Sequence, residues 1–432
     1  MNLEKLEGKK VRIFLNNGRV YEGTIIKRYD FTDKNYITLK LENGYNISIK
    51  KEDIDKIEEI SIVSFNLPKI EIEKNENLKD ILVVSTGGTI ASRVDYLTGA
   101  VKPLMKPENF LVYFPELINK ANFEIISPFS KFSEDMQPLD WLKLAKEVYK
   151  KVENNDYEGV IITHGTDTLH YTASAISFML QGSIPIAFTA AQRSSDRPST
   201  DAIMNMLAST DYILNNFGEV AIVMHKTSND NDLFAIRGVR ARKMHSSRRD
   251  TFRPINDLPI AEFYYDLKTK KLEKIREVRK LKDKGKELNP YFYLEEKVAL
   301  IKYYPGFPSE IIDLLVDKNY KGIIIEGTGF GHVSTEDKKL VESLKRAIEN
   351  ETFIFMTTQT LYGKVNPYVY ATARKLNNLG ITYLLDMIPE TAFVKLSWVL
   401  GQTQNKEEVK SLMLKNIAGE IKEDLKFNEF LV

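Results

Sequence analysis

The chain has 432 residues, with 61 Lys and Arg against 60 Asp and Glu, 28% charged and 43% hydrophobic residues, and no cysteine. This length predicts two or three domains with their own cores, and the composition excludes a disordered or fibrous chain. The lack of cysteine excludes disulfides, thiol nucleophiles and cysteine zinc sites, and with only five scattered histidines we expect no metal centre.

The N-terminal segment alternates apolar and polar residues with the period of half-buried strands. Two Asn-Gly pairs, Asn17-Gly18 and Asn43-Gly44, separate such runs, and this dipeptide favours the positive φ angles of tight hairpin turns. The runs are Val11–Leu15, Tyr21–Lys27, Tyr36–Leu41, Tyr45–Ile49 and Asp53–Ile57. We predict a small closed β-barrel in residues 1–72, because closure removes exposed sheet edges.

From residue 78 onward, continuous apolar runs are followed by turn residues and then by helical segments. The runs are Ile81–Val84, Val160–Ile162, Ile184–Phe188, Val220–Met224, Val298–Ile301, Ile323–Ile325 and Phe353–Met356. Strands that are apolar on both faces and separated by helices predict a mainly parallel sheet covered by helices. Such sheets carry their functional sites at the carboxyl ends of the strands.

Localisation follows from two features of the sequence. The N-terminus lacks the apolar stretch of a secretory signal, which indicates a cytoplasmic protein. Residues Tyr171 to Ala191 carry no charge, but Ser, Gln, Gly and Pro interrupt them. We interpret them as a buried helix, Tyr171–Leu180, followed by a buried strand, Pro185–Thr189, and expect no membrane contact.

One stretch, Lys268–Lys286, is nearly all charge, with ten cations and three anions. We interpret it as an exposed helix or linker between two α/β domains, and an RNA-facing patch is the alternative. The chain from Lys297 to Val432 holds at least three strands and an apolar-faced helix, Glu390–Gly401. We therefore place the α/β domains at residues 78–290 and 291–432.

A hydroxyl and two glycines follow the first buried strand in Ser85-Thr86-Gly87-Gly88-Thr89-Ile90. The segment lacks the Gly-Lys-Ser/Thr ending of a phosphate loop and the full dinucleotide pattern, so nucleotide binding is weakly supported. Thr89 at a strand end beside backbone amides has the arrangement that an acyl-transfer nucleophile needs.

A second polar turn, His164-Gly165-Thr166-Asp167-Thr168, follows the next buried strand and should lie at the same sheet edge. Taken alone, these hydroxyl and carboxylate groups fit a helix N-cap as well as a catalytic group. His164 alone is more typical of a hydrogen-bonded structural histidine.

A threonine nucleophile needs a base, and a lysine with a lowered pKa can serve. Cations crowd the segment after the fourth strand, which would place a lysine there among positive neighbours. They are Arg237, Arg240, Arg242, Lys243, Arg248, Arg249 and Arg253. Most are expected to be solvated or paired, and spacing alone does not say which lysine would act.

The two turns together resemble the signature motifs of the bacterial-type L-asparaginase family, and the resemblance continues over residues 81–432. It implies two asparaginase-like α/β domains. By position, the resemblance makes Thr89 the nucleophile and Tyr96 the loop tyrosine that assists it. Thr166, Asp167 and Lys243 match the second catalytic group, with Lys243 nine residues before Phe252. It also implies substrate binding by Ser133, which would hold the α-carboxylate, and by Glu134, Gly88 and Gly165.

Three features depart from a free asparaginase. The chain carries the N-terminal barrel, it has Ala190-Ala191-Gln192-Arg193 where free enzymes usually have a Met before the Arg, and Glu134 stands where many secreted enzymes have Gln. An asparaginase-like body behind an Sm/SH3-like barrel resembles the family of D subunits of archaeal glutamyl-tRNA(Gln) amidotransferases.

That resemblance implies a glutaminase that works as a homodimer and passes ammonia to a partner, the E subunit of the amidotransferase. The partner would use ATP and Mg²⁺ and hold most of the Glu-tRNA(Gln), with no cofactor in this chain. L-Glutamine or, less specifically, L-asparagine would donate the amide. Two alternatives are a free-standing cytoplasmic L-asparaginase and an RNA- or partner-binding platform that uses the barrel. Its aromatic residues Phe14, Tyr21, Tyr29, Phe31 and Tyr36 would suit base stacking, although strand aromatics are more often core.

Overall fold

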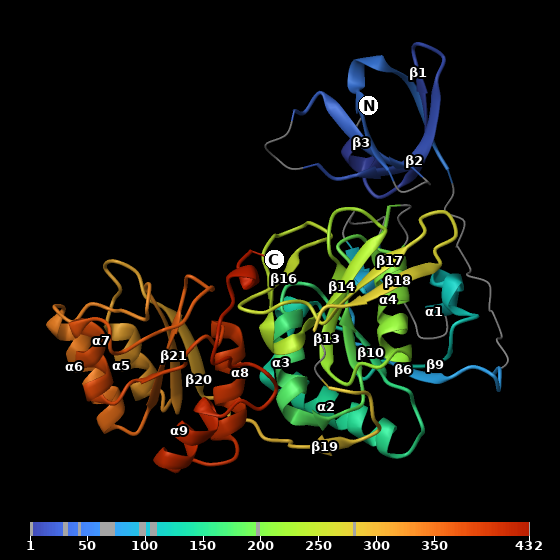
Figure 1. Ribbon diagram of the computed structural model, residues 1–432. Coiled ribbons are helices and arrows are strands. Elements are labelled where there is room, and N and C mark those ends of the chain that lie inside the picture. The colour runs from blue at the N-terminus through green and yellow to red at the C-terminus, as the bar shows by residue number, and fades with distance from the viewer. Residues whose placement is uncertain are drawn as a thin grey trace.

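The computed structural model describes residues 3–28, 33–41, 45–60, 74–94, 101–103, 110–195, 199–279 and 282–431. It contains a small N-terminal β-domain and two larger α/β parts built on separate sheets (Figure 1). The predicted Asn43-Gly44 turn, Tyr29, Phe31 and Tyr96 lie outside the described residues.

The N-terminal domain is an antiparallel five-stranded sheet in the order β4-β3-β2-β1-β5. Its strands are β1 Lys10–Leu15, β2 Val20–Ile26, β3 Tyr36–Leu41, β4 Asn46–Lys50 and β5 Ile54–Glu59. Alternate side chains such as Val11, Ile13 and Leu39 are fully buried, which confirms a small all-β domain. A 3₁₀ turn, Lys51–Asp53, connects β4 and β5, the strands at the two ends of this order.

The central part is an eight-stranded sheet in the order β18-β17-β14-β13-β12-β10-β6-β9. These strands are β6 Asp80–Ser85, β9 Asn122–Ile126, β10 Val160–Thr163, β12 Ile186–Thr189, β13 Val220–His225, β14 Asp232–Arg237, β17 Ala261–Tyr265 and β18 Leu272–Glu277. Five neighbouring strands of this sheet, β9, β6, β10, β12 and β13, are parallel to one another. Strands β14, β17 and β18 are antiparallel to their neighbours. The predicted mainly parallel sheet is confirmed.

Helices cover both faces of this sheet, which is why its strands are apolar throughout. The helices are α1 Phe110–Tyr113, α2 Pro138–Glu153, α3 Leu169–Met179 and α4 Ala202–Leu214. Ile162 and Phe188 face the core shared with α2 and α3, whereas Ile161 and Ala187 face α4. Helix α3 and strand β12 confirm the reading of the uncharged segment 171–191, and no helix in the described ranges has the length and apolar character needed to cross a membrane.

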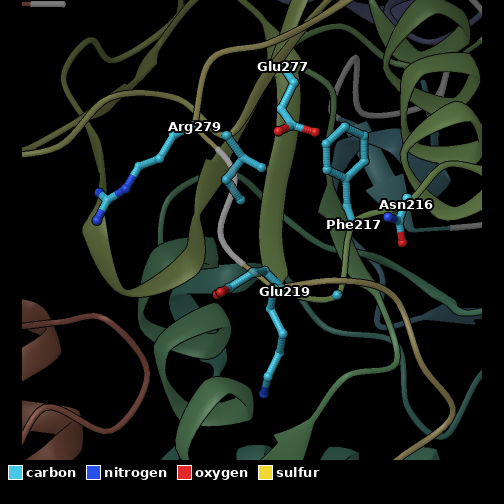
Figure 2. Close-up of a pocket in the computed structure, with 8 residues that line it drawn as sticks. Asn216, Phe217, Glu219, Glu277 and Arg279 are labelled. Atoms are coloured by element: carbon cyan, nitrogen blue, oxygen red, sulfur yellow. The ribbon is translucent and has the colours of Figure 1, made fainter.

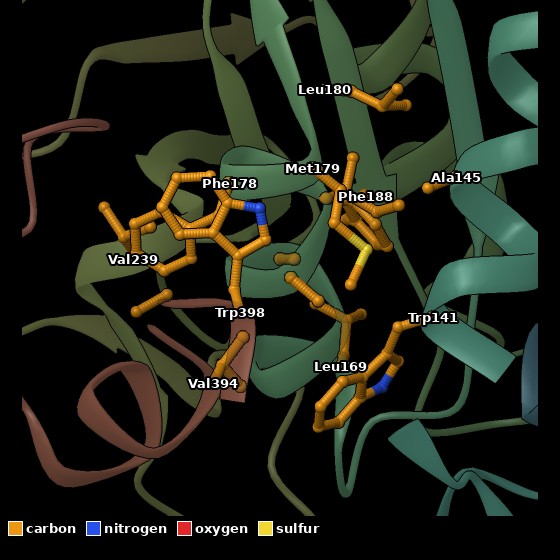
Figure 3. Close-up of a cluster of buried hydrophobic side chains, with 14 of the residues drawn as sticks. Trp141, Ala145, Leu169, Phe178, Met179, Leu180, Phe188, Val239, Val394 and Trp398 are labelled. Atoms are coloured by element: carbon orange, nitrogen blue, oxygen red, sulfur yellow. The ribbon is translucent and has the colours of Figure 1, made fainter. Parts of the chain in front are cut away.

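The C-terminal part is a parallel four-stranded sheet in the order β20-β21-β22-β23. Its elements are β20 Val298–Lys302, β21 Gly322–Gly327, β22 Phe353–Thr358, β23 Thr382–Tyr383, α5 Glu310–Asp317, α6 Lys338–Glu349, α7 Ala371–Leu379, α8 Pro389–Leu400 and α9 Lys406–Leu414. Helix α8 packs between this sheet and α3, so that one apolar cluster spans both α/β parts (Figure 3). Phe178 and Trp398 stack at its centre with ring centroids 5.7 Å apart.

The described residues also form three short two-stranded ladders. They are β7 Ser92–Val94 with β8 Val101–Pro103, β11 Leu180–Gly182 with β19 Leu288–Pro290, and β15 Ala241–Lys243 with β16 Phe252–Pro254. The last ladder pairs Lys243 with Phe252, so β16 holds the strand that carries the lysine.

The charged segment Lys268–Lys286 is not the predicted helix or linker. It contains β18, an edge strand in which only Leu272 and Ile275 are half-buried. Charged side chains suit an exposed edge because they discourage pairing with another chain. Several of its cations form ion pairs with other elements, namely Lys270–Glu116, Arg276–Glu262, Arg279–Asp257, Lys284–Glu158 and Lys286–Asp156. These pairs leave far less free charge for the alternative, an RNA-facing patch.

Candidate active site

The two polar turns predicted from the sequence meet at the carboxyl edge of the central sheet. Strands β6 and β10 are parallel neighbours, and Thr86 donates two hydrogen bonds to Thr163 O, from its backbone N at 3.0 Å and from Oγ1 at 2.9 Å. Gly88 has a φ of +75°, and a Cβ atom there would lie 2.3 Å from Gly165 N. Glycine is therefore required for the close packing of the two turns.

This packing brings the predicted nucleophile near the second catalytic group. Thr89 directly follows Gly88, begins a 3₁₀ turn, Thr89–Ala91, and is half-buried. Thr166 directly follows Gly165 and is 7% exposed. Both hydroxyl residues thus lie at the same edge, as the sequence predicted.

A third segment joins them from the loop after β9. Gly87 forms a bridge with Lys131, and Lys131 O accepts a hydrogen bond from Gly88 N at 3.2 Å. Ser133 is 3% exposed, and its Oγ accepts a hydrogen bond from Asp167 N at 3.2 Å. A Cβ atom on Gly165 would lie 2.7 Å from that Oγ. Ser133 is therefore part of the site edge.

Glu134, the next predicted substrate-binding residue, is exposed beside Ser133. Substrate contact by Ser133, Glu134, Gly88 and Gly165 stays a prediction. The structure shows that Gly88 and Gly165 are needed for close packing, of Gly88 against Gly165 and of Gly165 against Ser133.

Lys243 connects the two residues of the predicted second catalytic group. Its Nζ donates to Thr166 Oγ1 at 2.8 Å and to Asp167 Oδ1 at 2.7 Å. The lysine side chain is 11% exposed, whereas that of Asp167 is 61% exposed. An amine in contact with a threonine hydroxyl and a carboxylate can move a proton to or from that hydroxyl.

The helix-capping alternative for the second turn is not supported. Thr168 occupies the N-cap position of α3 without a side-chain cap bond, and its Oγ1 donates instead to Ser133 O at 2.6 Å. The structural reading of His164 is confirmed, because it is fully buried between Gly165 O and Thr172 Oγ1. Burial lowers its pKa to about 4, so the imidazole is neutral near pH 7.

The cations around Lys243 are paired, as expected for most of them. The ion pairs are Arg240–Asp386, Arg242–Glu390, Arg248–Asp250, Arg249–Asp230 and Arg253–Asp250. The positive surroundings expected from the sequence are thus compensated by carboxylates.

The backbone hydrogen bonds exclude one amide as a donor to the oxyanion of the predicted reaction. The Gly88 amide donates to Lys131 O and is committed to the loop. Other backbone amides of the two Gly-Thr turns, such as those of Thr89 and Thr166, remain candidates.

Sequence reasoning missed a buried polar group behind Lys243, formed by Arg242, Glu390 and His170. His170 Nε2 lies 4.0 Å from Glu390 Oε1. Burial together with Arg242 and Lys243 lowers the pKa of His170 to about 3. Glu390 begins α8, far along the chain from Arg242, so no local pattern signals the pair.

A small cavity lies at the opposite, amino-terminal edge of the central sheet (Figure 2). Its lining includes Asn216, Phe217 and Glu219 before β13, together with Glu277 and Arg279 at the end of β18. Its volume is about 10 Å³, which suits at most a water molecule and not an amino acid.

Comparison with known proteins agrees with the fold and the site. Residues 80–276 match the family model "Asparaginase, N-terminal", residues 297–413 match "Glutaminase/Asparaginase C-terminal domain", and residues 6–60 match "GatD N-terminal domain". The L-asparaginase of Thermococcus kodakarensis superposes with a TM-score of 0.71 and 29% identity, over 80% of this chain and 100% of that one. L-asparaginase I of Vibrio cholerae superposes with a TM-score of 0.66 and 29% identity, over 80% of this chain and 99% of that one.

The fold and the Lys243 site therefore define an amidohydrolase of the asparaginase type. The full-length relatives are more specific. The D subunit of the glutamyl-tRNA(Gln) amidotransferase of Pyrococcus abyssi is 47% identical over 95% of this chain and 93% of its own length. The corresponding D subunit of Thermococcus kodakarensis is 44% identical over 98% of this chain and 96% of its own length. The chain belongs to the family of glutamyl-tRNA(Gln) amidotransferase D subunits.

Proposed function

We propose that this chain is the ammonia-generating subunit of a glutamyl-tRNA(Gln) amidotransferase. The observation that carries the proposal is the contact of Lys243 with Thr166 and Asp167 beside the Thr86–Thr89 turn. The preceding domain supports it as well, because residues 6–60 match a domain named for this type of subunit.

In the proposed reaction, Thr89 Oγ attacks the side-chain amide carbon of L-glutamine, or less specifically L-asparagine. The Thr166–Lys243–Asp167 group and Tyr96 move protons, ammonia leaves, and water hydrolyses the acyl-threonine. Positioned oxyanion donors contribute about 3 to 4 kcal/mol, and general acid–base groups about 10²- to 10⁴-fold. Ser133 and Glu134 orient the amino acid.

The ammonia passes to a partner protein, which activates the γ-carboxylate of the tRNA-bound glutamate. ATP and Mg²⁺ belong to that partner, the E subunit of the amidotransferase, which also holds most of the tRNA. This chain works as a homodimer in the cytoplasm, where aminoacyl-tRNA is used.

Replacing the nucleophile tests the reaction. We expect Thr89→Ala to lose nearly all amidase activity and to keep its melting temperature, because Thr89 is only half-buried. Thr269→Ala, which removes an exposed hydroxyl between β17 and β18, is the matched control and should keep full activity. Substantial ammonia release by Thr89→Ala would exclude Thr89 as nucleophile.

A free-standing L-asparaginase is the second candidate, since two solved asparaginases are covered almost completely by this chain. It predicts full activity from the purified chain. The amidotransferase predicts weak activity that rises with the partner and Glu-tRNA(Gln).

We propose that the N-terminal domain binds the partner protein and does not serve mainly to stack RNA bases. Phe14 and Tyr36 are half-buried, and the cations of Lys56 and Arg28 lie over their rings at 5.9 Å from each centroid. Deleting residues 1–72 should weaken binding of the partner more than binding of tRNA. The reverse result would favour an RNA-binding platform.

A further inference from the structure

Strand β15 carries Lys243 between the two α/β parts of the molecule. Successive side chains of a strand point to opposite faces, so Arg242 points away from the Lys243 side. Arg242 Nη1 pairs with Glu390 Oε1 at 2.6 Å. Glu390 lies in the first turn of α8, the helix that packs on the C-terminal sheet.

Arg242 is the main compensating cation of Glu390 among the residues that the structure describes. It is 4% exposed, and burial raises its pKa. His170, at 4.0 Å, is neutral because its pKa is lowered to about 3. Glu326 and Lys302, which lie 3.9 Å from each other, act on the Glu390 carboxyl in opposite directions and less than Arg242 does. The Glu390 carboxylate and the Arg242 guanidinium therefore depend on one another for charge compensation.

The two neighbouring cations of β15 are held from opposite sides. Lys243 is bonded to Thr166 and Asp167 on the central sheet, and Arg242 is paired with Glu390 on α8. The next residue of α8 strengthens the connection, because Thr391 Oγ1 donates to Val239 O at 2.9 Å. Together these contacts fix both the position and the rotation of β15.

We propose that Arg242 and Glu390 are positioning residues for Lys243, which tie the catalytic lysine to the C-terminal α/β part. The inference rests on the proposed function, in which Lys243 moves a proton at Thr166. The pair acts in two ways: it anchors the strand, and it neutralises a guanidinium that otherwise lies unpaired next to the lysine.

The test compares kcat and KM for ammonia release from L-glutamine, measured on the full chain with its partner and charged tRNA. We expect Glu390→Gln to lower kcat about 100-fold, because small displacements of catalytic groups cost that much, with KM within about twofold. In the double variant Arg242→Met with Glu390→Gln, no charge is left unpaired. We expect its kcat to recover to about a tenth of the wild-type value, because only the anchor is missing.

A matched control comes from the same helix. Lys395 of α8 and Glu420 form another ion pair, at 2.6 Å, with neither side chain exposed. Glu420→Gln breaks a pair that is buried even more deeply and in which neither residue belongs to β15. It should therefore lower the melting temperature but leave kcat unchanged at temperatures below the unfolding transition.

A wild-type kcat for Glu390→Gln, or a loss equal to that of Glu420→Gln, would overturn the proposal. So would a double variant no more active than Glu390→Gln. If Glu390→Gln does not fold, the double variant decides alone: a tenfold lower kcat supports the anchor and a wild-type kcat overturns it. Absence of amidase activity from the wild-type complex would instead reject the proposed function.

Discussion

Gly88 gives the sharpest test of how the site is assembled. Its φ of +75° is unfavourable for any residue with a side chain, and a Cβ atom would lie 2.3 Å from Gly165 N and 2.6 Å from the carbonyl carbon of His164. These are backbone atoms, so no rotamer change relieves the contact. The two turns that carry Thr89 and Thr166 must separate by about 1 Å to reach ordinary van der Waals distance.

This geometry sets the expected magnitude for Gly88→Ala. The positive φ costs about 1 to 2 kcal/mol of folding free energy, and a displacement of about 1 Å costs about 10² in rate. Gly18→Ala is the matched control, since Gly18 has a φ of +81° with no atom within 4 Å of a Cβ position. We expect both variants to lose similar backbone energy, and only Gly88→Ala to lose activity.

The assay combines urea unfolding with kcat for ammonia release. If Gly88→Ala kept more than half of the wild-type kcat, the close packing of the two turns would not be needed for catalysis, and the reasoning would be refuted.

Two further predictions concern Lys243 and the buried histidines. Lys243→Met removes the amine from Thr166 and should lower kcat about 10²- to 10⁴-fold with a smaller change in KM, measured by steady-state kinetics; an unchanged kcat would remove Lys243 from the mechanism. His164 and His170 have pKa values of about 4 and 3 when folded, against 6.5 ordinarily. Because the unfolded chain takes up these protons first, stability should fall as the pH drops from about 6.5 toward 3, by about 2 kcal/mol per imidazole at pH 5. Urea unfolding at pH 7 and 5 checks this, and His170→Asn should remove about 2 kcal/mol of the drop; an unaltered pH dependence would contradict the assignment.

Much of the fold was predictable because the central strands are buried on both faces. Runs such as Val160–Ile162 and Ile323–Ile325 have no polar face, and only a sheet covered on both sides accommodates them. The same reasoning placed Thr89 and Thr166 at one edge, since both follow parallel strands of one sheet.

The interpretation of Lys268–Lys286 as a helix or linker was wrong, because its charged side chains are exposed on an edge strand. Composition indicated a solvated linker, whereas Leu272 and Ile275 pack against the apolar core and the segment forms an edge strand. Charge density alone does not distinguish an edge strand from a linker, since both face water.

The Arg242–Glu390 pair was not predictable for another reason. Its partners lie in separate α/β parts, and the pairing depends on how α8 docks between the two sheets. Helix capping by the second polar turn was equally plausible from the local sequence, but the Thr168 hydroxyl donates to Ser133 O in a distant loop. Tertiary contacts decided both cases.

The central claim is that this chain releases ammonia from glutamine for a partner. The most direct measurement is ammonia release from L-glutamine and from L-asparagine by the isolated chain, then with the partner protein and Glu-tRNA(Gln). We predict weak release by the chain alone and a marked increase with glutamine when both are added. Full activity of the isolated chain, indifferent to partner and tRNA, would contradict this claim.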